Sequence, residues 1–450
     1  MHTTDTIAAI ATAPGAGGIG IVRLSGPDAL RIGAAVCRRR LRPRRAHRVV
    51  FKDEDGTIID DGIALAFPAP RSYSGEDVVE LQAHGSPVVL DLLLRRCLAL
   101  GARMARPGEF SERAYHNGRL DLAQAEAVAD LIAAGSLAAA RAARRSLDGA
   151  FSRRVDALQA ALTALRVQVE AAIDFPEEEL DFLADAGLSR HLDDVCVIHA
   201  ALLADAARGQ RLRDGLHVVI AGLPNAGKSS LLNALAGAER AIVTPQAGTT
   251  RDLLREAVRI DGIELTLVDT AGLHAASDAV EIEGIRRARE ELASADLVLA
   301  VVDATDPTPA RTALTAELAS AAAILWLYNK ADLVPEPWSP LADGLWICAR
   351  SGSGLDALRE RLKAAAGLGG ATQEPMGGQG AFSTRARHLD ALRRVGGHLD
   401  LATQRLRVEK AGELTAEELR LAQQALGEIT GGVDSEALLG EIFAGFCIGK

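Results

Sequence analysis

Residues 217–230 read HVVIAGLPNAGKSS, and this stretch decides the fold of the central part of the chain. A strand is predicted at residues 217–221 and a helix at residues 230–236, and the loop between them has the GxxxxGK[ST] spacing of a phosphate-binding loop. Its glycines let backbone amides close around an anion, the helix start adds the positive end of its dipole, and Lys228 neutralises the β and γ oxygens. The stretch therefore predicts a nucleotide site in a parallel α/β domain, with Ser229 as a Mg²⁺ ligand.

Three further motifs follow in the order of a guanine-nucleotide site. Asp269-Thr270-Ala271-Gly272 ends a hydrophobic strand, which places a carboxylate near the metal and the Gly272 amide at the γ-phosphate. Asn329-Lys330-Ala331-Asp332 follows a predicted strand at residues 324–328. Asp332 can accept two hydrogen bonds from guanine, each worth about 1.5–3 kcal/mol, whereas adenine offers no such pair of donors. Cys348-Ala349-Arg350 stands where GTPases usually have Ser-Ala-Lys, and the Ala349 amide can still meet the guanine carbonyl.

The switch region lacks the usual catalytic glutamine. Leu273 follows DTAG, and an apolar side chain cannot orient the attacking water as the glutamine of Ras-like proteins does. Asn225 is either a plain turn residue or, with residues 241–252 (AIVTPQAGTTRD), part of a cage for a monovalent cation that replaces an arginine finger. We expect Thr250 to be the second Mg²⁺ hydroxyl and the γ-phosphate sensor. Glu281 is either a water-orienting acid or a solvated acid at a helix start.

Composition excludes several classes of protein. A chain of 450 residues with 48% hydrophobic and 24% charged residues favours two or three globular domains. No apolar run approaches the roughly 18 residues of a membrane span, and the start lacks the basic region of a signal peptide, so a cytoplasmic location is expected. The net charge of −10 excludes an overall electrostatic coat for nucleic acid. Five scattered cysteines without CxxC spacing are expected to be small buried hydrophobes rather than disulfides or zinc ligands.

The pattern along the chain predicts a multidomain fold of α/β and α parts. Strand-like runs at residues 5–11, 19–24 and 78–84 alternate with helical stretches at 29–37 and 87–100, so residues 1–118 are predicted to form a small α/β domain. Long Ala/Leu/Arg helices at residues 119–214, and helical periodicity again at 374–450 after a Gly-rich linker, predict one discontinuous helical domain. Residues 215–373 would be a Ras-like P-loop G domain inserted into it.

These motifs together resemble the MnmE (TrmE) family of tRNA modification GTPases. Beyond the nucleotide motifs, the resemblance rests on RLDLAQAEAVADLI at residues 119–132, DFPEEELDFL at 174–183 and FCIGK at 446–450. It implies a homodimer joined through its N-terminal domains, whose G domains meet across the nucleotides when K⁺ binds and so activate hydrolysis. It also implies that the chain, in a heterotetrameric or larger complex with the FAD-dependent partner MnmG, adds a carboxymethylaminomethyl or aminomethyl group to C5 of the wobble uridine of certain tRNAs.

The resemblance further implies roles for individual residues. The catalytic residues would be Glu281, which orients water through a second molecule, with Lys228, Gly272 and Cys447. K⁺ would be held by the Asn225 side chain and by oxygens of Thr244, Gln246 and Thr249, and Mg²⁺ by Ser229 and Thr250. A 5-formyl- or 5,10-methylene-tetrahydrofolate would contact Arg23, Glu80, Arg119, where the family has lysine, and Lys450. GTP would be contacted by Asn225, Ala226, Gly227, Lys228, Ser229, Ser230, Thr244, Gln246, Gly248, Thr249, Thr250, Asp269, Thr270, Ala271, Gly272, Asn329, Lys330, Asp332 and Ala349.

Three weaker signals keep their alternatives. GAGGIG at residues 15–20 matches the dinucleotide pattern GxGxxG, but a predicted strand follows it instead of a helix, so we interpret it as a glycine hairpin. The basic run at residues 38–48 either touches tRNA phosphate or is a solvated loop without interleaved aromatic residues. Cys447 either lies near the modification chemistry or is a plain buried thiol.

The alternative function for the G motifs is a GTP-dependent ribosome-assembly switch, which would more often carry an RNA-binding module such as KH.

Overall fold

The computed structural model describes residues 5–174, 186–236, 255–260, 263–269, 290–293, 295–319, 323–335, 343–365, 381–432 and 436–449. The chain forms two compact units. The first comprises Met1–Ala129, Ser146–His199 and Asp390–Lys450, and the second comprises Asp130–Arg145 and Ala200–Leu389. Among the described helices, none combines the length and the apolar character that a bilayer crossing requires.

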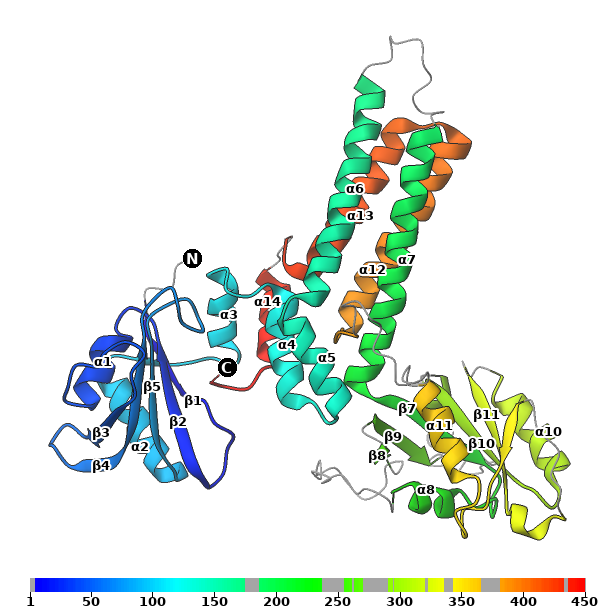
Figure 1. Cartoon of the computed structure of the whole chain (residues 1–450), viewed down its shortest axis with the longest axis horizontal. Helices are drawn as coiled ribbons and strands as arrows, with labels where there is room; N and C mark the ends of the chain where they lie inside the picture. The colour runs from blue at the N-terminus through cyan, green and yellow to red at the C-terminus, as the bar shows by residue number, and fades with distance from the viewer. Residues whose placement is uncertain are drawn as a thin grey trace, which may run out of the picture. The chain divides into compact units, whose positions relative to one another are not determined.

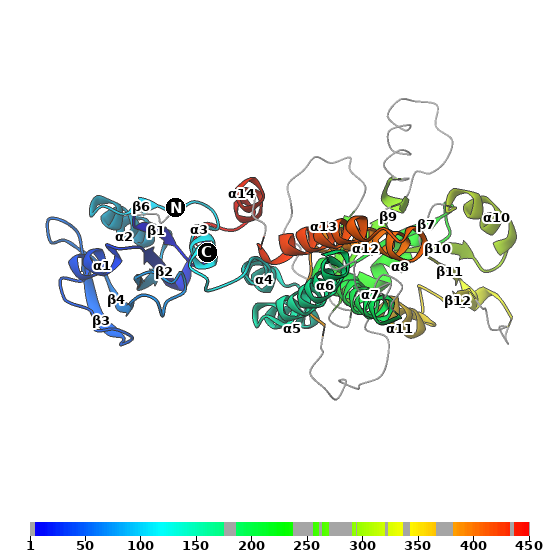
Figure 2. The ribbon, with the colours of Figure 1, turned by 90° about the horizontal axis from the view of Figure 1, so that it is seen from above.

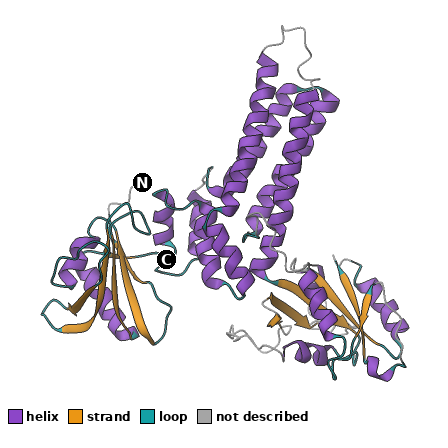
Figure 3. Ribbon diagram, viewed as in Figure 1, coloured by secondary structure: helices purple, strands orange, loops and turns teal. Residues whose placement is uncertain are grey.

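The first unit contains a six-stranded sheet with the strand order β3-β4-β5-β2-β1-β6. Its neighbours pair antiparallel except β1 and β6, and helices α1 and α2 pack on one face, as the ribbon shows (Figure 3). Alternate strand residues meet these helices in a core around Phe51, Ile32 and Leu93. The α/β class predicted here is confirmed, and each predicted element lies within two residues of an observed one. The elements are β1 (Ile7–Ile10), β2 (Gly17–Ser25), α1 (Ala29–Val36), β3 (His47–Lys52), β4 (Ile58–Phe67), β5 (Val78–Gly85), α2 (Pro87–Ala99), β6 (Arg103–Met104) and α3 (Glu109–His116).

The glycine-rich segment near the N-terminus is part of a β-hairpin. β1 and β2 pair antiparallel from Ile7 opposite Ser25 to Ile10 opposite Val22, and β2 already begins at Gly17. A Cβ at Gly20 would lie 2.4 Å from Cδ1 of Leu90, so a larger residue here would require the Leu90 side chain of α2 to move. The hairpin interpretation is confirmed, because no helix follows these glycines to bind a dinucleotide.

Long helices supply the predicted helical part. α6 runs along α13 (Figures 1 and 2), and the two are joined by Gln423, which accepts from Arg166 Nη1 and donates to Thr163 Oγ1. α7 meets α12 through the buried His199, whose Nε2 donates to the Leu392 carbonyl at 2.7 Å. Along the chain the helices are α4 (Leu122–Ala133), α5 (Leu137–Leu147), α6 (Ala150–Asp174), α7 (Ala186–Asp214), α12 (Ala386–Gln404), a π-helical turn (Arg405–Glu409), α13 (Gly412–Thr430) and α14 (Glu436–Ala444).

The second unit contains a three-layer α/β fold. Its sheet has the order β12-β11-β10-β7-β9-β8 and is parallel except for β8. Helices α8 and α11 pack on one face against Val218 and Ile220, and α10 packs on the other with Val219 and Ala221. A strand buried on both faces is continuously apolar, which is why β7 is so readily recognised in the sequence. The elements are β7 (Leu216–Gly222), α8 (Lys228–Ala236), β8 (Arg255–Ile260), β9 (Ile263–Asp269), β10 (Leu297–Asp303), α10 (Pro307–Glu317), β11 (Ile324–Asn329), the short 3₁₀ helix η2 (Ala331–Leu333), β12 (Gly344–Trp346) and α11 (Leu355–Ala365).

Candidate functional site

The predicted phosphate-binding loop joins β7 to α8. Asn225 (φ 63°) and Gly227 (φ 94°) both have left-handed backbone, which turns the loop so that α8 begins at Lys228. The Lys228 ammonium donates to the carbonyls of Gly222 at 2.9 Å and Leu223 at 3.3 Å, and is thereby held against the loop. Ser229 is exposed at the start of the helix. Because the first amides of a helix have no partner inside it, this exposed end fits the phosphate site that the sequence predicts.

Asn329 connects the phosphate-binding loop to the loop after β12. Its Nδ2 donates to the Ala226 carbonyl at 2.9 Å, and its Oδ1 accepts from the Ala349 amide at 3.0 Å. The side chain is only 3% exposed, and a Cβ at Gly227 would lie 2.2 Å from its Nδ2. In this structure Asn329 is a strut that fixes the two loops. The Ala349 amide therefore already has an acceptor, and its contact with guanine stays a prediction.

Lys330 and Asp332 flank the expected base position. Lys330 has left-handed backbone (φ 64°), and its ammonium pairs with Asp303 Oδ2 at 2.6 Å. Burial raises the pKa of Asp303, but hydrogen bonds from Lys330 and Thr305 outweigh burial and hold this pKa below its ordinary value. Asp332 is exposed, so its carboxylate is accessible to a base. Sequence reasoning missed Asp303, although a polar residue at the end of a buried parallel strand is a signal for a site at that sheet edge.

Part of the predicted nucleotide and metal site lies outside the described residues. Asp269 ends β9, and its backbone is in register with Ile220 of β7, which places it at the same sheet edge as the phosphate-binding loop. The cation-cage and switch residues lie outside the described part of the chain, so their Mg²⁺, K⁺ and water-orienting roles stay predictions. Outside the described residues are Thr244, Gln246, Gly248, Thr249, Thr250, Thr270, Ala271, Gly272, Glu281 and Lys450.

Arg23 is the centre of a second cluster, in the N-terminal sheet. β2 and β5 place it directly opposite Glu80, and its Nε donates to Glu80 Oε1 at 3.0 Å. Its guanidinium lies 5.4 Å from the centre of the Tyr73 ring and 5.8 Å from that of Phe110. The structure thus brings together Arg23 and Glu80 as predicted. Sequence reasoning missed the two aromatic rings, because cation–π contacts join residues without any fixed spacing.

The C-terminal tail reaches the same cluster. The Gly449 carbonyl accepts from Arg23 Nη1 at 3.4 Å, and Ile448 pairs with Pro107 as an isolated β-bridge. Gly449 has φ 97°, and a Cβ there would lie 2.2 Å from the Ile10 carbonyl oxygen. Lys450 directly follows this glycine in the sequence.

The predictions for the cysteines and for Arg119 have different outcomes. The plain buried thiol is wrong for Cys447, which is exposed although its neighbour Phe446 is buried in a hydrophobic cluster. The expectation of burial holds for Cys37, Cys97 and Cys348 but is also wrong for Cys196, which is only partly covered. Arg119 is exposed just after α3, with its Cγ close to Gly75, and none of the described contacts joins it to Arg23 or Glu80.

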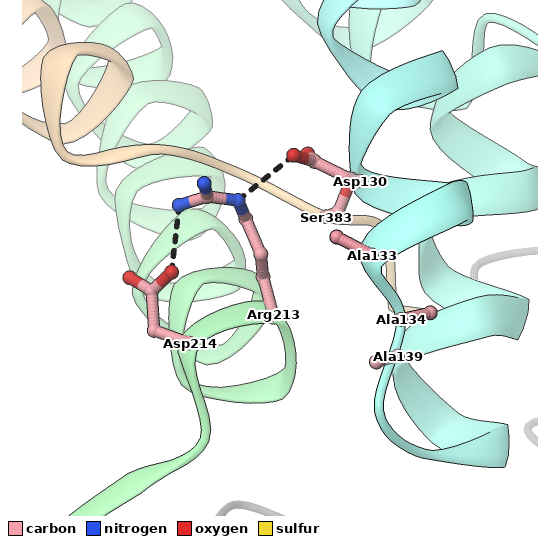
Figure 4. Close-up of a pocket in the computed structure, with 7 residues that line it drawn as sticks. All are labelled: Asp130, Ala133, Ala134, Ala139, Arg213, Asp214 and Ser383. Atoms are coloured by element: carbon pink, nitrogen blue, oxygen red, sulfur yellow. Dashed lines mark hydrogen bonds and ion pairs between the residues drawn. The ribbon is translucent and has the colours of Figure 1, made fainter. Parts of the chain in front are cut away.

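A small pocket lies where the chain passes between helical and α/β segments of the second unit (Figure 4). The buried Asp130 accepts from Arg213 Nε at 2.9 Å and from Arg385 Nη2 at 2.7 Å. Arg213 lies just before the residues that lead into β7, and Arg385 lies directly before α12. The Asp130 carboxylate therefore binds both segments that connect the helices to the α/β fold. Sequence reasoning missed it because these partners are 83 and 255 residues away. The pocket is lined by Asp130, Ala133, Ala134, Ala139, Arg213, Asp214 and Ser383.

Comparisons with known proteins cover almost the whole chain. The family model described as "GTP-binding protein TrmE N-terminus" matches residues 6–119, and the one described as "MnmE helical domain" matches residues 122–447. A Xanthomonas campestris pv. campestris (strain B100) protein named tRNA modification GTPase MnmE is 59% identical over 446 residues, 99% of each chain. A Pseudomonas savastanoi pv. phaseolicola (strain 1448A / Race 6) protein of the same name is 56% identical over 457 residues, again 99% of each chain.

Among solved structures, the G domain of the T. maritima FeoB iron transporter is similar at 25% identity with a TM-score of 0.28, covering 34% of this chain and 98% of that chain. The assignment to a family is based on the two family models and on the full-length relatives. It is consistent with the phosphate-binding loop and the C-terminal tail described above. The chain belongs to the MnmE (TrmE) family.

Proposed function

We propose that this chain is a GTPase that takes part in tRNA modification. The observation that carries the proposal is the phosphate-binding loop locked to β11 by Asn329, with Asp332 exposed beside it. The relatives named tRNA modification GTPase MnmE, similar over 99% of their length, support the same activity.

The described residues have distinct parts in GTP hydrolysis. Amides of the loop around Gly227 bind the β- and γ-phosphates, and the Lys228 ammonium, already at the loop, neutralises their oxygens. Asp332 accepts from N1–H and N2–H₂ of guanine, which selects GTP over ATP. Ser229 would hold Mg²⁺ together with Thr250, and the metal would neutralise charge that develops on the phosphates.

The proposal includes activation by K⁺. Asn225 supports it, because its side chain is exposed at the edge of the loop and its amide oxygen is accessible to a cation there. The remaining K⁺ oxygens would come from Thr244, Gln246 and Thr249, and Glu281 would orient the water.

Turnover measured in K⁺ and in Na⁺ at equal ionic strength tests this activation. We expect many-fold faster hydrolysis in K⁺, by analogy with the roughly 10³ to 10⁵ that an arginine finger supplies. Equal rates would reject the cation cage. Glu281→Ala should bind GTP normally and hydrolyse it slowly, and a parallel loss of binding would reject its water-orienting role.

The tRNA chemistry is the second half of the proposal. Acting as a homodimer with MnmG, the chain would modify C5 of the wobble uridine, with a one-carbon folate held near Arg23 and Glu80. A guanidinium next to a carboxylate and the partly exposed Tyr73 ring suits a flat heterocycle with hydrogen-bonding edges, which supports this position. Mass spectrometry of wobble nucleosides from cells lacking the protein should show loss of the C5 group. Unchanged nucleosides would favour the ribosome-assembly switch instead.

A further inference from the structure

The loop between α1 and β3 is the most basic segment of this acidic chain. Residues 38–45 read RRRLRPRR, six arginines with no acidic residue, whereas the whole chain has a net charge of −10. We call residues 38–45 the arginine loop. The sequence leaves its role open between a solvated loop and a contact with tRNA.

The arginine loop has a fixed backbone. Leu41 is buried in the core of the sheet, at 7% exposure. The Arg42 amide donates to His47 Nε2 at 2.9 Å, and the Arg44 amide donates to the Ala66 carbonyl at 2.8 Å. A partner that binds here does not have to order the backbone first, so little conformational entropy is lost on binding.

Four side chains of the loop have no structural task among the described residues. Arg38 contacts the Asp53 carbonyl and Arg44 contacts the Arg71 carbonyl, so these two brace the loop. The other four are exposed and form no ion pair or hydrogen bond through their guanidinium groups within the described part of the chain. They are Arg39, Arg40, Arg42 and Arg45.

Several exposed arginines elsewhere in this unit pair with a carboxylate on the same helix. Arg31 pairs with Asp28, Arg95 with Asp91 and Arg420 with Glu417, each at 2.8 Å. The arginine loop differs because it contains no acidic residue one helical turn away. It therefore presents uncompensated positive charge, which attracts a polyanion.

Strand register places His47, two residues after the arginine loop, level with the backbone next to Arg23. The loop enters β3 at His47, which is opposite Ala64 of β4. Ala64 is opposite Leu81 of β5, and Leu81 is opposite Val22, the neighbour of Arg23. Three strand spacings of about 4.8 Å give about 14 Å across the sheet. Val22 lies on the face that α1 and α2 cover and Arg23 lies on the other face, so an RNA strand that joins Arg23 to the arginine loop would pass over the β3 edge of the sheet.

We propose that the arginine loop binds the phosphate backbone of the tRNA arm that presents the uridine to the Arg23 cluster. This inference rests on the proposed function. Because no aromatic residue is interleaved with the arginines, the contact positions the RNA and does not read its sequence.

The test is the salt dependence of tRNA binding by the full-length protein. Fluorescence anisotropy with labelled tRNA between 50 and 200 mM salt compares the wild type with the triple variant R40Q/R42Q/R45Q. Each lost phosphate contact changes the slope of log K against log salt by about 0.7 to 0.9, so three contacts should reduce its magnitude by about 2 to 3. The matched control R31Q/R95Q/R420Q removes the same charge from ion-paired positions, and its slope should change by less than about 1.

A conservative variant separates charge from structure. R40K/R42K/R45K keeps the charge and should keep most of the wild-type slope, and all variants should retain basal GTP hydrolysis because the loop is not part of the nucleotide site. Equal slopes for the glutamine variant and the control would overturn the proposal, as would loss of the slope in the lysine variant. The proposal would also be overturned if the glutamine variant lost binding to anionic phosphatidylserine vesicles but kept its binding to tRNA. A wild type that hydrolyses GTP but does not bind tRNA would instead reject the tRNA half of the proposed function.

Discussion

Replacing Asn329 with alanine tests whether this residue is the strut of the nucleotide site. The substitution removes two hydrogen bonds, one from Nδ2 to the Ala226 carbonyl and one from the Ala349 amide to Oδ1. Both backbone groups belong to buried residues, with Ala226 at 4% and Ala349 at 9% exposure. Each loses its partner in a place that water does not readily reach.

The size of the effect follows from these contacts. A net hydrogen bond contributes about 1 kcal/mol, and a buried group left without a partner costs about 1–3 kcal/mol. Two such groups, with some relief from water entering the small cavity, give about 2–4 kcal/mol for local opening of the two loops. At about 1.4 kcal/mol per tenfold change, opening becomes about 30 to 1,000 times more frequent.

Native-state hydrogen exchange of the Ala349 amide is the direct assay, because this amide donates to Asn329 itself. Its protection factor should fall by the same 30- to 1,000-fold, and the affinities for GTP and GDP should fall together, since the strut does not touch the γ-phosphate region. Amides in the core of β10 serve as the internal control and should change little. Unchanged protection at Ala349, or a loss of GTP affinity without loss of GDP affinity, would refute the strut.

Four other perturbations follow from the described contacts. Asp130→Asn should lower the free energy of unfolding of the second unit by about 1–3 kcal/mol in urea. This is less than the roughly 3–5 kcal/mol of a fully buried ion pair, because the two arginines bound to Asp130 are partly exposed. An unchanged urea midpoint would argue against a structural role of these ion pairs. Gly449→Ala should release the tail, since a Cβ meets a carbonyl oxygen of β1, and faster proteolysis of the tail would report it. The hydrogen bond from Arg103 holds the pKa of Asp5 below its ordinary value of 3.8 despite burial. This stabilisation is therefore present above pH 3.8 and is lost as the pH falls through the lower pKa of the folded state. Arg103→Gln should destabilise β1 at pH 7 and much less at acid pH, as measured by hydrogen exchange. Cys447 should react with a thiol reagent at pH 8 in the folded protein, whereas the two buried N-terminal thiols, whose pKa burial raises to about 12, should not.

Local patterns were sufficient for the fold class and for the nucleotide loop. The strand-loop-helix at β7 and α8 was predicted because a buried parallel strand is apolar throughout and the loop requires glycine at fixed positions. The antiparallel hairpin of β1 and β2 was predicted by the same local logic. Resemblance supplied Arg23 and Glu80, and the register of β2 and β5 brings them together.

Contacts between residues that lie far apart along the chain could not be predicted from the sequence. The double role of Asn329, the pairing of Lys330 with Asp303 and the junction at Asp130 each depend on strand order and helix packing, which no spacing rule encodes. The exposure of Cys447 was misjudged for the same reason, because burial depends on which surface the tail crosses.

The sequence by itself therefore determined which elements form, that glycine and lysine line a phosphate loop, and that arginines concentrate at residues 38–45. The tertiary structure alone decided which of those arginines are exposed without a described carboxylate partner and that the strand after them is in the same sheet as Arg23. Secondary structure and loop chemistry arise from neighbours along the chain, whereas charge compensation and proximity arise from neighbours in space.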